Sequence, residues 1–403
     1  MQAFLARSSM QEKTSSYRAD IDGLRAIAVI AVVVSHAAPS AVTGGFIGVD
    51  VFFVISGYLI TGNILADLSS GRFDLVAFYA RRIRRLFPAL LLVMAAAWVA
   101  GWLLLLPDDF EVLGRHLAAS AAFVPNFMFW RDQAASDHDV KIDALLHLWS
   151  LGVEEQYYLV WPLIVLAVFG RWTRIARVTA TLVLISFALN IVLTFDLTEA
   201  AFYLPFPRFW ELLAGSALAF AGAYARETPA RASLYIALST EKASRSLNDA
   251  KAWVGLALIA VSIVVLTKQH MFPGFWVLLP VVGTALLIAS GPGAAVNRLL
   301  SNRGLVAIGL ISYPFYLWHW PLLSLAEYSW DSGLTTLSRL LIALLALPLA
   351  WLTYRYVERP IRYAAPDRRP TAATRALLLA MTAIFVLGIL TYLNSGFGWR
   401  LPL

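Results

Sequence analysis

The feature that most constrains this chain is a series of long apolar runs separated by short polar or charged connections. Each run is roughly twenty residues long, which is the length that an α-helix needs to cross the ~30 Å hydrocarbon core of a bilayer. Hydrophobic residues make up 60% of the sequence and charged residues only 14%. We therefore predict an all-α, polytopic integral membrane protein. An outer-membrane barrel is excluded, because its strands are shorter and alternate polar with apolar residues.

Twelve apolar runs are candidates for membrane spans, at 24–39, 46–65, 86–106, 113–130, 147–169, 175–194, 204–224, 252–267, 274–290, 305–326, 335–357 and 373–393. The run 113–130 carries Arg115, His116, Pro125 and Asn126. If this run does not cross, all the strongly basic connections fall on the cytoplasmic side, as membrane topology favours. We therefore predict a re-entrant or external segment at 113–130 and eleven spans, with a cytoplasmic N-terminus and a periplasmic C-terminus.

The chain divides into three predicted parts. Residues 1–17 form a polar tail without a cleavable signal peptide, and 18–362 form the transmembrane domain, with a cytoplasmic insertion at 227–250. Residues 363–403 form a linker, a last transmembrane helix and a short external tail. The net charge of +7 comes from clusters beside the apolar runs, so it indicates membrane topology and not nucleic-acid binding.

The first two runs carry ionisable residues that membrane helices normally avoid. Arg25 and His36 are eleven residues apart, almost three helical turns, so they share one helix face at a separation of ~16 Å. Asp50, on the second run, lies at a depth similar to that of His36. A carboxylate close to an imidazole fixes its tautomer and favours a general base. The spacing thus predicts a polar path through the bilayer that ends at His36.

Further polar residues cluster near the same outer ends of later runs. Glu154 lies two turns below His147, while Arg208 and Glu211 open one run and His319 lies in the outer half of another. The histidines and Arg208 are also compatible with helix–helix hydrogen bonds or helix-end anchors. Glu154 is harder to explain structurally, because carboxylates inside membranes are costly and usually functional.

Arg82 and Arg85 stand three residues apart in the basic stretch 78–90 and point in the same direction. Two guanidinium forks on one face suit phosphate recognition, although cytoplasmic anchoring explains the same spacing. Arg25 at the same level adds a third guanidinium and favours an anionic, phosphate-bearing ligand. An enzyme and a proton-coupled transporter of an anionic solute both remain compatible with these residues. No metal or permanently bound cofactor is predicted, and the absence of cysteine excludes disulfides and thiolate chemistry.

At these residues the chain resembles the membrane-bound acyltransferase family 3, the bacterial O-acyltransferases. The resemblance extends over nearly the whole chain, in motifs that occur in the family's order. They are RADIDGLRAIAVIAVVVSH at 18–36, GGFIGVDVFFVISGYLI at 44–60, FYARRIRRLFPAL at 78–90, HLWSLGVEEQYYLVWPL at 147–163, PRFWELLAGSALA at 207–219, ISYPFYLWHWPLL at 311–323 and VERPIR at 357–362.

The resemblance implies an O-acetyltransferase that takes an acetyl group from cytoplasmic acetyl-CoA to a hydroxyl of a cell-envelope polysaccharide such as O-antigen or lipopolysaccharide. It implies that His36 is essential, that Arg25, Arg82 and Arg85 serve the donor, and that Glu154 is also needed. On this basis we expect His36, oriented by Asp50 or Glu154, to act as a base or to carry the acyl group.

The family core has ten spans, so the resemblance implies that the eleventh helix leads towards an external SGNH-type domain, or that a separate acceptor-side protein takes its place. It also implies a multi-pass protein of the bacterial inner membrane. The expected partners are acetyl-CoA, a glycan acceptor and the lipid bilayer, with no nucleic acid. A proton-coupled transporter of an anionic solute stays the alternative.

Overall fold

The computed structural model describes residues 17–134, 143–227, 240–241, 243–267, 269–330, 333–363 and 372–400. These residues form helices and connecting turns, with no strand among them. Most of the predicted 227–250 insertion and almost all of the 1–17 tail lie outside the described residues. The helices are α2 (Ala19–Ala37), η1 (Gly45–Ile47), α3 (Gly48–Ser69), α4 (Leu75–Leu104), α5 (Pro107–Ala121), α6 (Pro125–Ala134), α7 (Leu148–Val168), α8 (Trp172–Asp196), α9 (Thr198–Tyr203), α10 (Phe209–Glu227), α12 (Arg245–Val265), α13 (Leu278–Ser290), α14 (Ala295–Leu300), α15 (Arg303–Leu310), α16 (Ser312–Tyr328), α17 (Thr336–Leu352), the π-helical turn η2 (Thr353–Glu358), α18 (Arg359–Tyr363), α19 (Ala372–Leu393) and η3 (Ser395–Arg400).

Membrane-spanning length and composition are met by seven helical stretches within the described residues. They are Gly45–Ser69, Leu75–Leu104, Leu148–Val168, Trp172–Asp196, Arg245–Val265, Thr336–Arg362 and Ala372–Leu393. Shorter apolar helices occur at Phe209–Ala225 and Leu278–Ser290. The chain is thus an all-helical, multi-pass membrane protein, and the count of eleven spans and the orientation of the termini stay predictions.

The run 113–130 does not form one continuous helix. It is divided between α5 and α6, with a turn in which Phe123 has a φ of 57°. The fifteen residues of α5 extend over ~22 Å, which is less than the ~30 Å hydrocarbon core. The division agrees with the prediction that this run does not cross as a single helix.

The helices that carry the polar residues pack at very short range through glycine. A Cβ atom at Gly57 of α3 would collide with the backbone of Leu212 in α10, and one at Gly215 of α10 would collide with the backbone of Val54 in α3. Only glycine leaves room for two helix backbones to approach so closely. This contact brings the beginning of α3, with Asp50, beside the beginning of α10.

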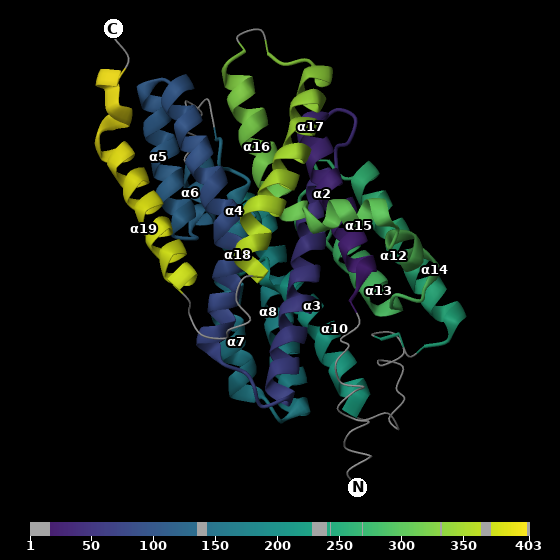
Figure 1. The fold of residues 1–403 in the computed structure, drawn as a ribbon. Coiled ribbons are helices and arrows are strands. Elements are labelled where there is room, and N and C mark those ends of the chain that lie inside the picture. The colour runs from purple at the N-terminus through teal and green to yellow at the C-terminus, as the bar shows by residue number, and fades with distance from the viewer. Residues whose placement is uncertain are drawn as a thin grey trace.

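The last described helix, α19, runs along one edge of the bundle beside α5, whereas α12 and α14 lie at the opposite edge (Figure 1). Beyond α19 the guanidinium of Arg400 donates hydrogen bonds to the carbonyl oxygens of Gly101, Trp102 and Leu105, where α4 ends. It also lies 4.3 Å from the ring centroid of Phe110. The segment after α19 is therefore held against the end of α4.

Candidate functional site

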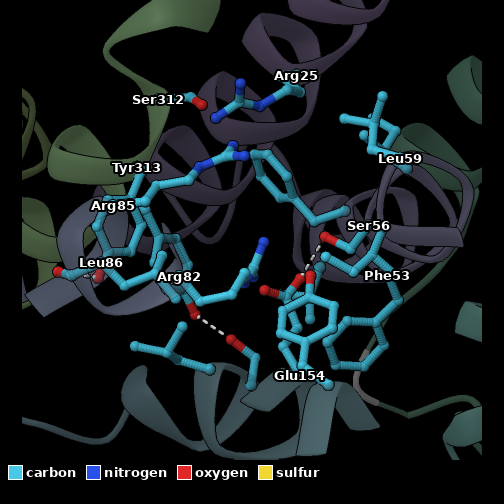
Figure 2. A pocket seen from close by; sticks show the side chains of 18 of the residues that line it. Arg25, Phe53, Ser56, Leu59, Arg82, Arg85, Leu86, Glu154, Ser312 and Tyr313 are labelled. Atoms are coloured by element: carbon cyan, nitrogen blue, oxygen red, sulfur yellow. Dashed lines mark hydrogen bonds between the residues drawn. The ribbon is translucent and has the colours of Figure 1, made fainter. Parts of the chain in front are cut away.

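One cavity, which we name the arginine cavity, lies between α2, α3, α4, α7 and α16 and has a volume of about 100 Å³. Arg25, Arg82 and Arg85 all line it, so the structure brings together the three arginines that the sequence analysis grouped. Figure 2 shows their guanidinium groups directed towards the same space, although they come from two different helices.

Two of the three arginines, Arg82 and Arg25, are held in different ways. Arg82 lies over the ring of Tyr158, 3.9 Å from its centroid, and its guanidinium is 3.3 Å from the carboxylate of Glu155. Arg25 makes an ion pair of 3.1 Å with Asp22, one turn earlier in α2. These partners orient the guanidinium groups without closing the cavity, because all three arginines still line it.

Glu154 belongs to the arginine cavity and not to the surroundings of His36. Its carboxylate accepts a hydrogen bond of 2.8 Å from the Ser56 hydroxyl, and both residues line this cavity (Figure 2). The prediction that Glu154 orients the His36 ring is therefore wrong, because the Glu154 carboxylate is hydrogen-bonded to Ser56 and lines the arginine cavity. Its side chain is directed towards Ser56 of α3 and the arginines.

A second cavity, which we name the histidine cavity, has a volume of about 480 Å³. His36 of α2 and Asp50 of α3 line it, together with His147, Arg208 and Trp320. Val49 and Tyr316 line both cavities, so the two spaces adjoin each other at these side chains. The arginine cavity and the histidine cavity are thus neighbours along α2, which contributes Arg25 to the first and His36 to the second.

The ring of His36 is hydrogen-bonded to a second histidine. Nδ1 of His36 lies 3.0 Å from Nε2 of His319, and Nδ1 of His319 lies 2.5 Å from the backbone carbonyl oxygen of Tyr316. A carbonyl oxygen only accepts, so Nδ1 of a neutral His319 carries the hydrogen and its Nε2 accepts. Nδ1 of His36 is then the donor, which leaves the lone pair of the His36 ring on Nε2.

Two aromatic residues support this pair. Trp320 packs edge-on against His36, with ring centroids 4.6 Å apart, and its indole nitrogen donates to the carbonyl oxygen of Asp143. The Tyr316 hydroxyl donates to the carbonyl oxygen of His147 at 2.6 Å. Neither aromatic residue is among the site residues predicted from the sequence. The position of Tyr316 three residues before His319, on the same helix face, is the signal that would have found it.

His147 is buried beside the two bonded histidines. Its ring centroid is 5.7 Å from that of His319 and 5.3 Å from that of Tyr316. Among the described residues neither ring nitrogen of His147 has a hydrogen-bond partner. The structure thus brings His36, His147 and His319 together, as the predicted polar cluster required.

Asp50 is paired with Arg208, and not with His36 as the sequence analysis expected. Its Oδ1 lies 2.5 Å from the Arg208 guanidinium, which is also 3.0 Å from the carboxylate of Glu211. All three side chains are at most 1% exposed. Aromatic rings enclose the guanidinium at 5.5–5.8 Å, contributed by Phe53, Trp149, Phe202 and Phe272. Arg208 reaches Asp50 because α3 and α10 pack so closely, a contact that sequence spacing does not reveal.

The amino-acid sequence is similar to those of known proteins. A family model described as an acyltransferase domain matches residues 18–355. Peptidoglycan O-acetyltransferase OatA of Listeria monocytogenes is 32% identical over 357 residues, which cover 86% of this chain and 56% of that relative. O-acetyltransferase OatA of Staphylococcus aureus is 30% identical over 356 residues, 86% of this chain and 57% of the relative.

The putative peptidoglycan O-acetyltransferase YrhL of Bacillus subtilis is 32% identical over 370 residues, which cover 88% of this chain and 56% of that relative. The chain thus spans a little over half the length of these curated relatives. No solved structure matches the chain. Because the family model covers most of the sequence, including every helix that lines the two cavities, this chain belongs to the membrane-bound acyltransferase family 3.

Proposed function

We propose that this chain is an O-acetyltransferase of the bacterial cytoplasmic membrane that moves an acetyl group from cytoplasmic acetyl-CoA to a hydroxyl of a cell-envelope glycan. The observation that carries the proposal is the meeting of the arginine cavity and the histidine cavity at Val49 and Tyr316. Two of the relatives are named as acting on peptidoglycan, so peptidoglycan is the first acceptor to test, before O-antigen or lipopolysaccharide.

The arginine cavity suits the donor. Coenzyme A carries its phosphates at one end and its thioester at the end of a long flexible arm. Arg25, Arg82 and Arg85 would bind the phosphates, because planar guanidinium forks match phosphate oxygens. The arm then follows the polar face of α2 for the ~16 Å that separates Arg25 from His36.

His36 acts through Nε2 in this proposal. As a general base it takes the proton of the acceptor hydroxyl while the hydroxyl oxygen attacks the thioester carbonyl, and the tetrahedral intermediate then expels CoA as a thiolate, which takes up the proton. As a nucleophile Nε2 would attack the thioester carbonyl, CoA would leave as a thiolate, and the acceptor hydroxyl would then take the acetyl group from Nε2 while its proton neutralises the thiolate. Both routes need the lone pair of His36 on Nε2, which is the tautomer favoured by the His319 hydrogen bond.

The proposal is tested with the purified full chain in lipid nanodiscs and acetyl-labelled acetyl-CoA. We expect slow hydrolysis of the donor without acceptor, transfer when muropeptides or intact sacculi are added, and loss of both in His36→Ala. Mass spectrometry of envelope glycans from cells with and without the gene should show a missing acetyl group. Near-normal turnover by a folded His36→Ala protein, or no binding of acetyl-CoA, would overturn the proposal.

A further inference from the structure

The histidine cavity is much larger than an acetyl group requires. Its volume of about 480 Å³ lies within the roughly 300–1,000 Å³ of sites that enclose a small molecule. The donor arm enters from the arginine cavity, at the boundary formed by Val49 and Tyr316. The same cavity is also lined by Asp50 and by residues of α9, and its volume leaves room for a second substrate.

Buried polar atoms around this space lack partners among the described residues. They are Oδ2 of Asp50, Nε of Arg208, and both ring nitrogens of His147, whereas Nη1 of Arg208 lies 3.0 Å from the carboxylate of Glu211. Asp50, Arg208 and His147 all line the cavity, and none is more than 3% exposed. A buried polar atom without a hydrogen bond typically costs about 1–3 kcal/mol, so native proteins rarely leave several together. A ligand with both donors and acceptors, such as a set of hydroxyl groups, satisfies the whole group.

Aromatic side chains form much of the remaining wall. Trp149, Phe202, Phe272 and Trp320 all line the cavity, and three of them also enclose Arg208. Flat apolar rings beside a few fixed polar groups are the lining that a pyranose ring needs, because its C–H faces are apolar and its edge carries hydroxyls. The wall therefore favours a sugar over a fatty chain, which has no use for the polar atoms.

The charges of the two cavities differ in sign. Among its described lining residues the arginine cavity has three guanidinium groups and one carboxylate, that of Glu154. The histidine cavity has one guanidinium, that of Arg208, and two carboxylates, those of Asp50 and Glu199. A polyanionic donor is thus attracted to one space, and an anionic acceptor is disfavoured in the other.

We infer that the histidine cavity is the acceptor subsite and that it binds an uncharged sugar unit, with one hydroxyl directed towards Nε2 of His36. The inference rests on the proposed function and deepens it, because donor and acceptor then meet within one chain. Asp50 and Arg208 hold other hydroxyls of the sugar, and Glu199 at the exposed edge disfavours acidic sugars. Transfer to a hydroxyl of an external protein domain is the competing outcome.

The test uses the full chain in nanodiscs with two soluble probes of equal length, neutral N,N′,N″-triacetylchitotriose and anionic trigalacturonic acid. We expect acetylation of the neutral probe, saturation-transfer NMR signals from its ring protons, and little reaction of the anionic probe. Asp50→Asn should raise the KM for the neutral probe about tenfold and leave the KM for acetyl-CoA unchanged. Donor hydrolysis without sugar reports separately on the proposed function.

Glu199→Gln provides a variant on the exposed side of the cavity, where folding is not at risk. Removing one nearby charge should shift the ratio of anionic to neutral probe use by about three- to fivefold towards the anionic probe. Asp196→Asn is the matched control, because this exposed carboxylate is close in sequence but is not among the described lining residues. Its ratio should equal that of the unaltered protein.

Three results would overturn the inference while leaving the proposed function intact. They are donor hydrolysis with no binding of either trisaccharide, a preference for the anionic probe, and an unchanged ratio in Glu199→Gln. The inference is also overturned if the acetyl group is transferred only to an added hydrolase-like domain and to neither trisaccharide. If acetyl-CoA is not turned over at all, the proposed function fails, and the NMR signals of the neutral probe still decide whether a sugar binds.

Discussion

Nδ1 of His36 lies 3.0 Å from Nε2 of His319, and this hydrogen bond joins α2 to α16 beside the histidine cavity, which His36 lines. The carbonyl oxygen of Tyr316 accepts from the other nitrogen of His319 and so sets the direction of the bond. A backbone carbonyl does not change its role with pH or ligand, which makes it a stable reference for both rings. The nitrogen of His36 that keeps its lone pair is therefore determined by a residue one turn before its partner histidine.

Replacing His319 tests this direction. Glutamine at this position retains an acceptor for Nδ1 of His36, whereas leucine does not. We expect His319→Leu to lower kcat by at least about tenfold, a smaller loss than the 10²–10⁴-fold that removal of a general base typically costs. His319→Gln should recover much of the activity and the pH profile of kcat/KM. Equal activities in the two variants would show that the hydrogen bond has no positioning role.

The arginine pair of α4 should govern donor affinity. Arg82→Ala combined with Arg85→Ala is expected to raise the KM for acetyl-CoA by roughly a hundredfold or more, because each of the two lost phosphate contacts is worth about 1.5–3 kcal/mol. Arg81→Ala is the matched control, since Arg81 is exposed, pairs with Asp67 and does not line the cavity. If the double variant and Arg81→Ala have similar KM values for acetyl-CoA, Arg82 and Arg85 serve only as cytoplasmic anchors of the helix.

The ion pairs of Arg208 should matter for stability as well as for acceptor binding. Arg208→Met leaves the carboxylates of Asp50 and Glu211 buried without their cation, a change that costs about 3–5 kcal/mol when a buried pair is broken. We expect a clearly lower midpoint of thermal unfolding in detergent. Adding Asp50→Asn and Glu211→Gln to the same protein should restore most of the lost thermal stability. If the midpoint of unfolding stays low, packing of Arg208 against the aromatic rings is the larger contribution.

The close contact of α3 with α10 predicts a sharp difference between two glycines of α3. Gly57→Ala places a methyl group against the backbone of Leu212, whereas a Cβ at Gly62 meets nothing within 4 Å. We expect Gly57→Ala to destabilise the protein by about 1–3 kcal/mol, as overpacking does. Gly62→Ala should be neutral or slightly stabilising, because alanine favours helix. Thermal unfolding of both variants decides the point, and equal midpoints would contradict the close packing.

Much of the site could be predicted because helical spacing is local. The separation of eleven positions from Arg25 to His36, and of three from Arg82 to Arg85, fixes which side chains share a face before any tertiary contact exists. Charge bias in the connections likewise identified 113–130 as unfit to cross, and the structure divides that run between α5 and α6. Composition alone determined the all-helical, membrane-embedded class.

Only the tertiary structure decided which polar groups meet. Asp50 and His36 are predicted to lie at similar depths, yet Asp50 pairs with Arg208, which is 158 residues away along the chain. His36 pairs with His319, which is 283 residues away. Each choice depends on the distance and rotation between helices, set by contacts such as Gly57 against Leu212. Periodicity specifies the face of a single helix, but it carries no information on the neighbour that this face meets.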